Sequence, residues 1–129
     1  MKRILIVDDD LDIVNLVKNR LENNHYEVIV ANDGSQGIKQ AQEQRPDLII
    51  MDILMPLMPG GDAVRLLKTD VKTKHIPIIF LTAVIANIPR GGPGVDEKGI
   101  NVGGQFYPAI AKPFEPAQLL FEIKKLIGD

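Results

Sequence analysis

Carboxylate, hydroxyl and ammonium side chains follow separate apolar runs of this sequence. Asp8 and Asp9 come directly after the first run, Asp52 ends the third, Thr82 ends the fourth and Lys112 follows the fifth. Clustered carboxylates raise one another's pKa unless a cation lies between them, and carboxylates with retained waters suit Mg²⁺. An Asp beside Mg²⁺ can attack a phosphoryl group, whose oxygens Thr82 and Lys112 would then contact. These residue types predict a magnesium-dependent acidic site with Asp52 as the phosphoryl acceptor.

Each of these residues also has a purely structural alternative. Asp9 or Asp10 can cap a helix, which is worth about 1 kcal/mol. Thr82 alone can bond to the backbone, and Lys112 alone can be a solvated charge. Asp52 differs, because an ionised carboxylate that ends a buried apolar run needs a cation or several hydrogen-bond donors. The combination of residue types, more than any single one, carries the functional hypothesis.

The elements that position these residues are short apolar runs that alternate with helical segments. Because the runs do not alternate apolar with polar residues, they are typical of strands covered on both faces. The runs are 4–7, 28–31, 48–51 and 78–81, and 106–111 is a weaker candidate because Pro108 interrupts it. Apolar stripes at helical spacing start at Leu11, Ile38, Ala63 and Leu119. This alternation predicts one doubly wound α/β domain over residues 1–129, in which ligands bind beyond the carboxyl ends of the strands.

Residues 88–108 break the alternation, because they contain six Gly and three Pro. Each interior Gly costs a helix about 1 kcal/mol and each Pro about 3 kcal/mol, so a regular fourth crossover helix is not expected here. We expect a long loop with one short helical turn at 95–98. Loops of this length in compact domains usually have a function.

Composition restricts the class of protein. With 129 residues, 45% hydrophobic and 25% charged, the chain has the composition of one globular domain. A net charge of −2 argues against direct nucleic-acid binding, which needs a basic surface. The absence of Cys excludes disulfides and thiolate chemistry and favours a cytoplasmic location. No run is long enough for a signal peptide or a membrane span, so no membrane partner is expected.

Four segments together resemble the receiver domain of two-component response regulators. They are residues 4–9 (ILIVDD), 47–56 (DLIIMDILMP), 77–83 (PIIFLTA) and 112–114 (KPF). The resemblance covers nearly the whole chain and implies a flavodoxin-like, five-stranded parallel sheet of order 2-1-3-4-5. It implies a switch and not a turnover enzyme, with a sensor histidine kinase or a histidine phosphotransfer protein as phosphodonor. The downstream protein target is unknown, and a phosphorylation-dependent homodimer is an open option.

The resemblance also implies the roles of the acidic residues. Asp52 matches the phosphoacceptor, and Asp9 matches the direct Mg²⁺ ligand. Asp8 matches a neighbour that reaches the ion through water, and the backbone carbonyl of Leu54 matches a third protein ligand.

The resemblance also implies roles for Thr82, Lys112 and Ala83, and it shows one departure from the family. Thr82 matches the switch hydroxyl, Lys112 the lysine that contacts the phosphoryl group, and Ala83 a small residue that leaves access to it. The family's switch aromatic falls on Ala109 here, although Tyr107 has the same strand parity and could replace it. The usual output surface is therefore in question.

A second departure concerns the lifetime of the phosphorylated state. Side chains two positions after the phosphoacceptor and two after the switch hydroxyl help to orient the attacking water in the family. Here they are the apolar Leu54 and Val84. We therefore expect slow self-catalysed dephosphorylation.

Two other functions fit part of this pattern. A haloacid-dehalogenase-type phosphatase also uses an Asp nucleophile with Mg²⁺, but the sequence lacks the last element of its first motif and the acidic pair after Lys112. An interaction module on the same fold that is never phosphorylated rests only on the unusual 88–108 region. No output domain follows the last expected helix, so the chain is either a stand-alone receiver or a piece of a larger regulator.

Overall fold

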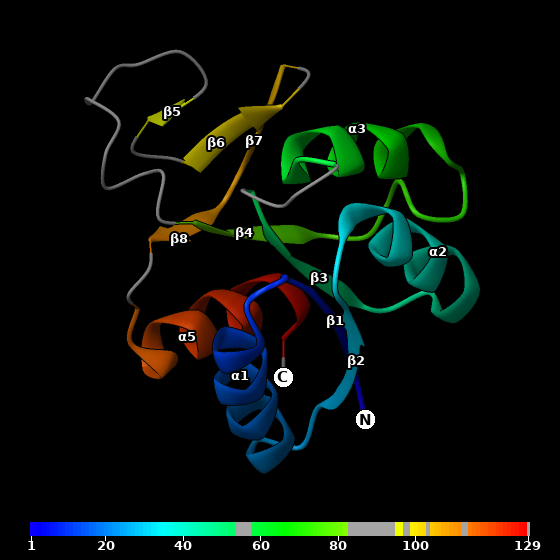
Figure 1. The fold of residues 1–129 in the computed structure, drawn as a ribbon. Helices are drawn as coiled ribbons and strands as arrows, with labels where there is room; N and C mark the ends of the chain where they lie inside the picture. Colours follow the sequence, from blue (N-terminus) through cyan, green and yellow to red (C-terminus); the bar gives the residue numbers. More distant parts are fainter. Residues whose placement is uncertain (54–57, 83–94, 97–98, 103, 112–113, 129) are drawn as a thin grey trace.

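The computed structural model describes the chain except for residues 54–57, 83–94, 97–98, 103, 112–113 and 129. A sheet of five parallel strands forms its centre, in the order β2-β1-β3-β4-β8 (Figure 1). The strands are β1 (Arg3–Val7), β2 (Glu27–Ala31), β3 (Leu48–Asp52), β4 (Ile78–Thr82) and β8 (Ala109–Ala111). The predicted order 2-1-3-4-5 is confirmed, with β8 in the fifth place. The last strand is shorter than the expected 106–111, because Pro108 separates it from the residues before it.

Four helices cover the two faces of this sheet in the described part of the chain. They are α1 (Leu11–Asn23), α2 (Gly34–Gln44), α3 (Gly60–Thr69) and α5 (Pro116–Ile127). Helices α1 and α5 lie on one face, and α2 and α3 lie on the other (Figure 1). The side chains of Ile4–Val7 and Leu48–Met51 are fully buried, because each strand packs against helices on both sides.

The helix ends follow from local sequence signals. The carboxylate of Asp10 accepts hydrogen bonds from the backbone N–H groups of Asp12 (3.0 Å) and Ile13 (3.4 Å), which caps α1. Pro116 lies in the first turn of α5, and Gly128 ends that helix with φ 85°. One expectation was wrong, because Leu11 is 64% exposed and does not join the buried stripe of α1.

The region between β4 and β8 contains a second, antiparallel sheet in its described part. Its strands, in the order β5-β6-β7, are β5 (Val95–Asp96), β6 (Gly99–Val102) and β7 (Gln105–Tyr107). The expected helical turn at 95–98 was wrong, since 95–96 form a strand. Val102 pairs with Gln105, so only residues 103 and 104 connect β6 to β7. Gly104 has φ 90°, a conformation that two-residue hairpin connections commonly require and that Gly adopts without strain.

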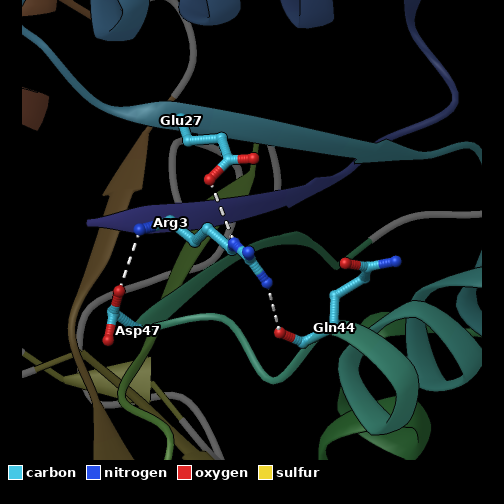
Figure 2. A network of polar contacts seen from close by, with 4 residues as sticks. All are labelled: Arg3, Glu27, Gln44 and Asp47. Carbon is cyan, nitrogen blue, oxygen red and sulfur yellow. Dashed lines mark hydrogen bonds and ion pairs between the residues drawn. The ribbon is translucent and has the colours of Figure 1, made fainter. Parts of the chain in front are cut away.

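Arg3 links several elements at the amino end of the sheet (Figure 2). Its guanidinium donates from Nε to Glu27 Oε2 (3.0 Å) and from Nη1 to the carbonyl of Gln44 (3.0 Å). Its backbone N–H donates to Asp47 Oδ2 (2.8 Å). These contacts join β1 to β2 and to the α2–β3 connection, at the opposite end of the strands from the acidic residues.

Of the helices that the structure describes, none has the length and apolar character needed to cross a bilayer.

Candidate functional site

Three carboxylates meet at the carboxyl ends of β1 and β3. The strands are adjacent and parallel, and Val7 pairs with Met51, so the residues that follow this pair lie beside each other. Oxygen atoms from Asp8, Asp9 and Asp52 all lie within 4.8 Å of one another. Asp8 is completely buried and Asp52 is 5% exposed, whereas Asp9 is exposed. The structure therefore brings together the three acidic residues that the sequence predicts for the site.

The backbone around Asp8 fixes one side of this cluster. Asp8 Oδ1 accepts a hydrogen bond from the N–H of Asp10 (2.9 Å), and the N–H of Asp8 donates to the carbonyl of Ala31 (3.2 Å). Asp10 in turn caps α1, as described above. Asp10 therefore has the structural role that the sequence left open, and among the described residues it is not part of the three-carboxylate cluster.

The start of α3 fixes the other side, next to Asp52. The N–H of Gly60 donates to the carbonyl of Ile53 (2.9 Å), so the first residue of α3 is bonded to the chain just beyond β3. A Cβ at position 60 would lie 2.3 Å from the carbonyl oxygen of Asp52 and 2.9 Å from Ile53 Cα. Only Gly allows this approach. The sequence interpretation missed Gly60, although a Gly-Gly pair shortly after the third apolar run was a visible signal.

Of the other predicted site residues, Thr82 lies in the described part of the chain and Lys112 does not. Thr82 ends β4, which lies beside β3 with Asp52 opposite Leu81, so its backbone is at the same edge of the sheet. Thr82 also pairs with Ala111, the last residue of β8. Lys112, which follows Ala111 in the sequence, lies outside the described residues. So do Leu54, Ala83 and Val84.

Tyr107 is the predicted replacement for the family's switch aromatic. Tyr107 ends β7 and Ala109 begins β8, so the two belong to different sheets and do not share one strand. The Tyr107 side chain is 5% exposed, and its ring packs edge-on against Phe80 with the centroids 5.9 Å apart and the planes at 87°. Burial raises the pKa of the Tyr107 hydroxyl. Its role as a switch stays a prediction.

The donor set of the cluster suits a small, hard divalent cation. All three side chains offer carboxylate oxygens, which Mg²⁺ and Ca²⁺ prefer, and none offers nitrogen or sulfur. Two of the carboxylates are buried, and buried charges of like sign need a compensating positive charge nearby. The third is exposed, so solvent has access to one side of the cluster. An ion that retains several waters, as Mg²⁺ does, fits this half-open arrangement.

Comparison with known families agrees with the fold and with the acidic cluster. The model of the response regulator receiver domain matches residues 4–124. This chain belongs to the response regulator receiver domain family. That membership places it among the signalling switches of two-component systems and favours the receiver interpretation over the phosphatase one.

Several curated relatives are similar over almost the whole chain. The alkaline phosphatase synthesis transcriptional regulatory protein PhoP of Bacillus subtilis is 32% identical over 126 residues, which are 98% of this chain and 48% of that protein. The polar-differentiation response regulator DivK of Brucella anthropi is 35% identical over 129 residues, covering 99% of this chain and 98% of DivK. The chain thus spans about half the length of the transcriptional regulator, and nearly all of DivK.

Solved structures show the same architecture. The chemotaxis protein CheY4 of Vibrio cholerae has a TM-score of 0.82 at 30% identity, with 98% of each chain covered. The receiver domain of a sensor histidine kinase of Pseudomonas aeruginosa has a TM-score of 0.82 at 29% identity, with 99% of this chain and 98% of that one covered. In that Pseudomonas structure a magnesium ion is coordinated in the active-site cleft.

Proposed function

We propose that this chain is the phosphoacceptor domain of a histidine-to-aspartate phosphorelay, and that Mg²⁺-dependent phosphorylation of Asp52 switches its contacts with other proteins. The observation that carries the proposal is the cluster of Asp8, Asp9 and Asp52 at the carboxyl ends of adjacent strands, with Asp52 almost completely buried. Membership of the receiver family supports it independently of this geometry.

The acidic cluster would hold the metal ion. We assign Asp9, Asp52 and the backbone carbonyl of Leu54 as protein ligands, with Asp8 contacting the ion through water. When bound, Mg²⁺ supplies positive charge that offsets the carboxylates and the phosphoryl oxygens together. The exposure of Asp9 supports this assignment, because it leaves room for water and for the incoming phosphoryl group.

The phosphoryl transfer would use Asp52 as the nucleophile. A carboxylate oxygen of Asp52 attacks the phosphorus of a phosphohistidine, the new O–P bond forms, and the P–N bond breaks. The electron pair of that bond stays on the imidazole nitrogen, which takes up a proton. We assign Lys112 and the Thr82 hydroxyl to the phosphoryl oxygens, where charge develops, and Ala83 to the space beside them.

A second step, hydrolysis of the aspartyl phosphate, restores the resting state. Water attacks the phosphorus, the O–P bond breaks, and Asp52 leaves as a carboxylate while inorganic phosphate is released. Each cycle consumes one phosphoryl group and makes no other product, so the chemistry serves to time a signal. We therefore propose a switch in place of a turnover enzyme.

The partners follow from this chemistry. The phosphodonor would be a sensor histidine kinase or a histidine phosphotransfer protein, and the receiver of the signal would be a downstream protein or a second copy of the chain. The transfer requires the phosphohistidine to reach the acidic cluster, and the exposure of Asp9 supports access from that side. A cytoplasmic location, where such kinases present their histidines, is part of the same proposal.

Small-molecule phosphorylation tests the proposal without knowing the kinase. The protein is incubated with phosphoramidate and Mg²⁺, and intact-mass spectrometry measures the gain of one phosphoryl group. The gain should require Mg²⁺, should disappear in Asp52→Ala and should become far slower in Asp9→Asn. Asp12→Asn is the matched control, because Asp12 is an exposed carboxylate in the first turn of α1, outside the cluster. A gain that persists in Asp52→Ala, or none in the native protein, would contradict the assignment.

A further inference from the structure

A cavity of about 380 Å³ lies between α3 and the β6–β7 hairpin. Helix α3 contributes Val64, Arg65, Lys68 and Thr69 to its wall. None of the lining residues belongs to the acidic cluster. Small-molecule sites in proteins typically have volumes of about 300–1,000 Å³, so the cavity can accept a compact organic molecule and not a large one.

The hairpin side of the cavity is mostly apolar and held in place. Val102 and Tyr107 line it, at 9% and 5% exposure. The Tyr107 ring is fixed by its edge-on contact with Phe80 of β4, which is itself fully buried. An apolar wall whose side chains are already fixed favours binding, because few protein side chains are then ordered by the ligand.

Of the two cations that line the cavity, Lys68 is the more buried. Its Nζ donates to the carbonyls of Lys74 (2.9 Å) and Ile76 (2.7 Å) and lies 5.6 Å from the centroid of the Tyr107 ring. These partners are neutral. In the described part of the chain, no ion pair joins Lys68 to a carboxylate.

Electrostatics at this position favour an added negative charge. Burial lowers the pKa of Lys68, as expected for a cation that leaves water without gaining a counter-charge. An ammonium has three donors, and two of them have the carbonyl partners named above, so one remains for a ligand. Arg65 adds a second cation at the exposed rim. Its contact with Asp62 is 3.9 Å long and exposed, so it competes weakly.

We propose that this cavity binds a small organic carboxylate with a compact apolar body. The carboxylate is held by the charges of Lys68 and Arg65, and the apolar body lies against the apolar side of the cavity, which Val64, Val102 and Tyr107 line. A dianionic phosphate suits the cavity less well, because Val64, Val102 and Tyr107 give one side of it an apolar lining that a phosphate would leave without a partner. The side-chain amide of Gln105, at the exposed rim, supplies a hydrogen bond that orients the ligand.

A pair of isosteric probes tests the charge requirement without any mutation. The ¹⁵N-labelled protein is titrated with phenylacetate and, separately, with phenylacetamide, and amide chemical shifts are followed. Phenylacetate should give saturable shifts confined to residues 64–69 and 100–107, and phenylacetamide should bind at least tenfold more weakly. Equal binding of the two probes, or shifts scattered over the surface, would overturn the proposal.

Two neighbouring substitutions test the location. Gln105→Trp should fill the cavity from its exposed rim and weaken phenylacetate binding at least tenfold. Phe106→Trp is the matched control, because Phe106 is the next residue of β7, is 43% exposed and does not line the cavity. Unchanged binding in Gln105→Trp, with the fold intact by its amide spectrum, would overturn the site.

The charge and the phosphorylation state give two independent controls. Lys68→Gln keeps a donor for the two carbonyls but removes the charge, and it should also weaken phenylacetate binding at least tenfold. The titration is repeated in Asp52→Ala, where binding should be unchanged. This arm separates a failure of the cavity proposal from a failure of the proposed phosphorylation.

Discussion

The contact between Gly60 and the backbone of Asp52 gives a prediction that joins stability to function. In Gly60→Ala, the new Cβ would lie 2.3 Å from the carbonyl oxygen of Asp52, whereas real Cβ contacts essentially never fall below 3.0 Å. The two atoms must therefore separate by at least 0.7 Å, the difference between these distances. Both obstacles, the Asp52 carbonyl and Ile53 Cα, are backbone atoms that cannot rotate away.

The expected size of the effect follows from this geometry. Overpacking typically costs about 1–3 kcal/mol of unfolding free energy, and a backbone obstacle places Gly60→Ala near the upper end. The shift also moves either α3 or the acceptor carboxylate, and a misplacement of about 1 Å can slow a positioned reaction by roughly 10²-fold. Gly60→Ala should therefore unfold at lower urea concentration and be phosphorylated by phosphoramidate much more slowly than the native protein.

Gly61→Ala is the matched control for this prediction. Gly61 is the next residue of α3, and no atom lies within 4 Å of the place its Cβ would occupy. Replacing Gly by Ala inside a helix typically adds about 0.5–1 kcal/mol of stability, so Gly61→Ala should be as stable as the native protein or more so, with normal phosphorylation. If Gly60→Ala matched Gly61→Ala in both assays, the proposed positioning of Asp52 by α3 would be refuted.

Three further predictions concern other parts of the molecule. Arg3→Ala removes two exposed side-chain hydrogen bonds at the amino end of the sheet, so the free energy of unfolding in urea should fall by about 1 kcal/mol. The phosphorylation rate should be unchanged, and a changed rate would mean that this end of the sheet is coupled to the acidic cluster. Because burial raises the pKa of Tyr107, its contribution to stability is present below the unfolded pKa near 10 and is lost as pH rises through the higher folded value. The free energy of unfolding should therefore fall less in Tyr107→Phe than in the native protein when the pH is raised from neutral to above about 10. If the free energy of unfolding fell equally with pH in the two proteins, this prediction would be contradicted. Changing Leu54 to Asn together with Val84 to Glu should speed the loss of phosphate from the phosphorylated protein, measured by the decay of the intact-mass adduct, and an unchanged decay would show that these positions do not set the lifetime.

The parallel sheet and the acidic cluster could be predicted because both depend on short-range signals. Continuous apolar runs such as Ile4–Val7 and Leu48–Met51 identify strands buried on both faces, and they are fully buried in the structure. The carboxyl ends of adjacent parallel strands must meet at one edge. The sequence therefore predicts that Asp8 and Asp52 lie together, and their carboxylate oxygens lie within 4.8 Å of each other.

The segment between β4 and β8 shows where the same reasoning failed. Its Gly content favours a loop, although Ile100 and Val102 are apolar at alternate positions and Gly103-Gly104 separates them from Phe106 and Tyr107. That pattern is a hairpin signal. Gly also weakens strands, so this pattern alone does not decide between a loop and a hairpin. The hairpin is stabilised by the packing of Tyr107 on Phe80, a contact between residues far apart in the sequence.

Gly60 and Leu11 were missed for a different reason. The requirement for Gly at position 60 arises from the approach of α3 to the backbone of Asp52, which no local pattern records. Leu11 has the spacing of the buried stripe of α1, but it is the first residue of the helix and 64% exposed. Periodicity gives the face of a helix but not how far the packed interface extends along it.

The most direct test of the central claim is to locate the phosphoryl group in the chain. The protein is phosphorylated with phosphoramidate and Mg²⁺, the acyl phosphate is reduced with borohydride, and peptide mass spectrometry identifies the reduced position. We predict reduction at position 52 and at no other carboxylate, and none when Mg²⁺ is removed by a chelator. Reduction at Asp8, at Asp9 or at an acidic residue outside the cluster, or reduction at position 52 that does not depend on Mg²⁺, would contradict the account.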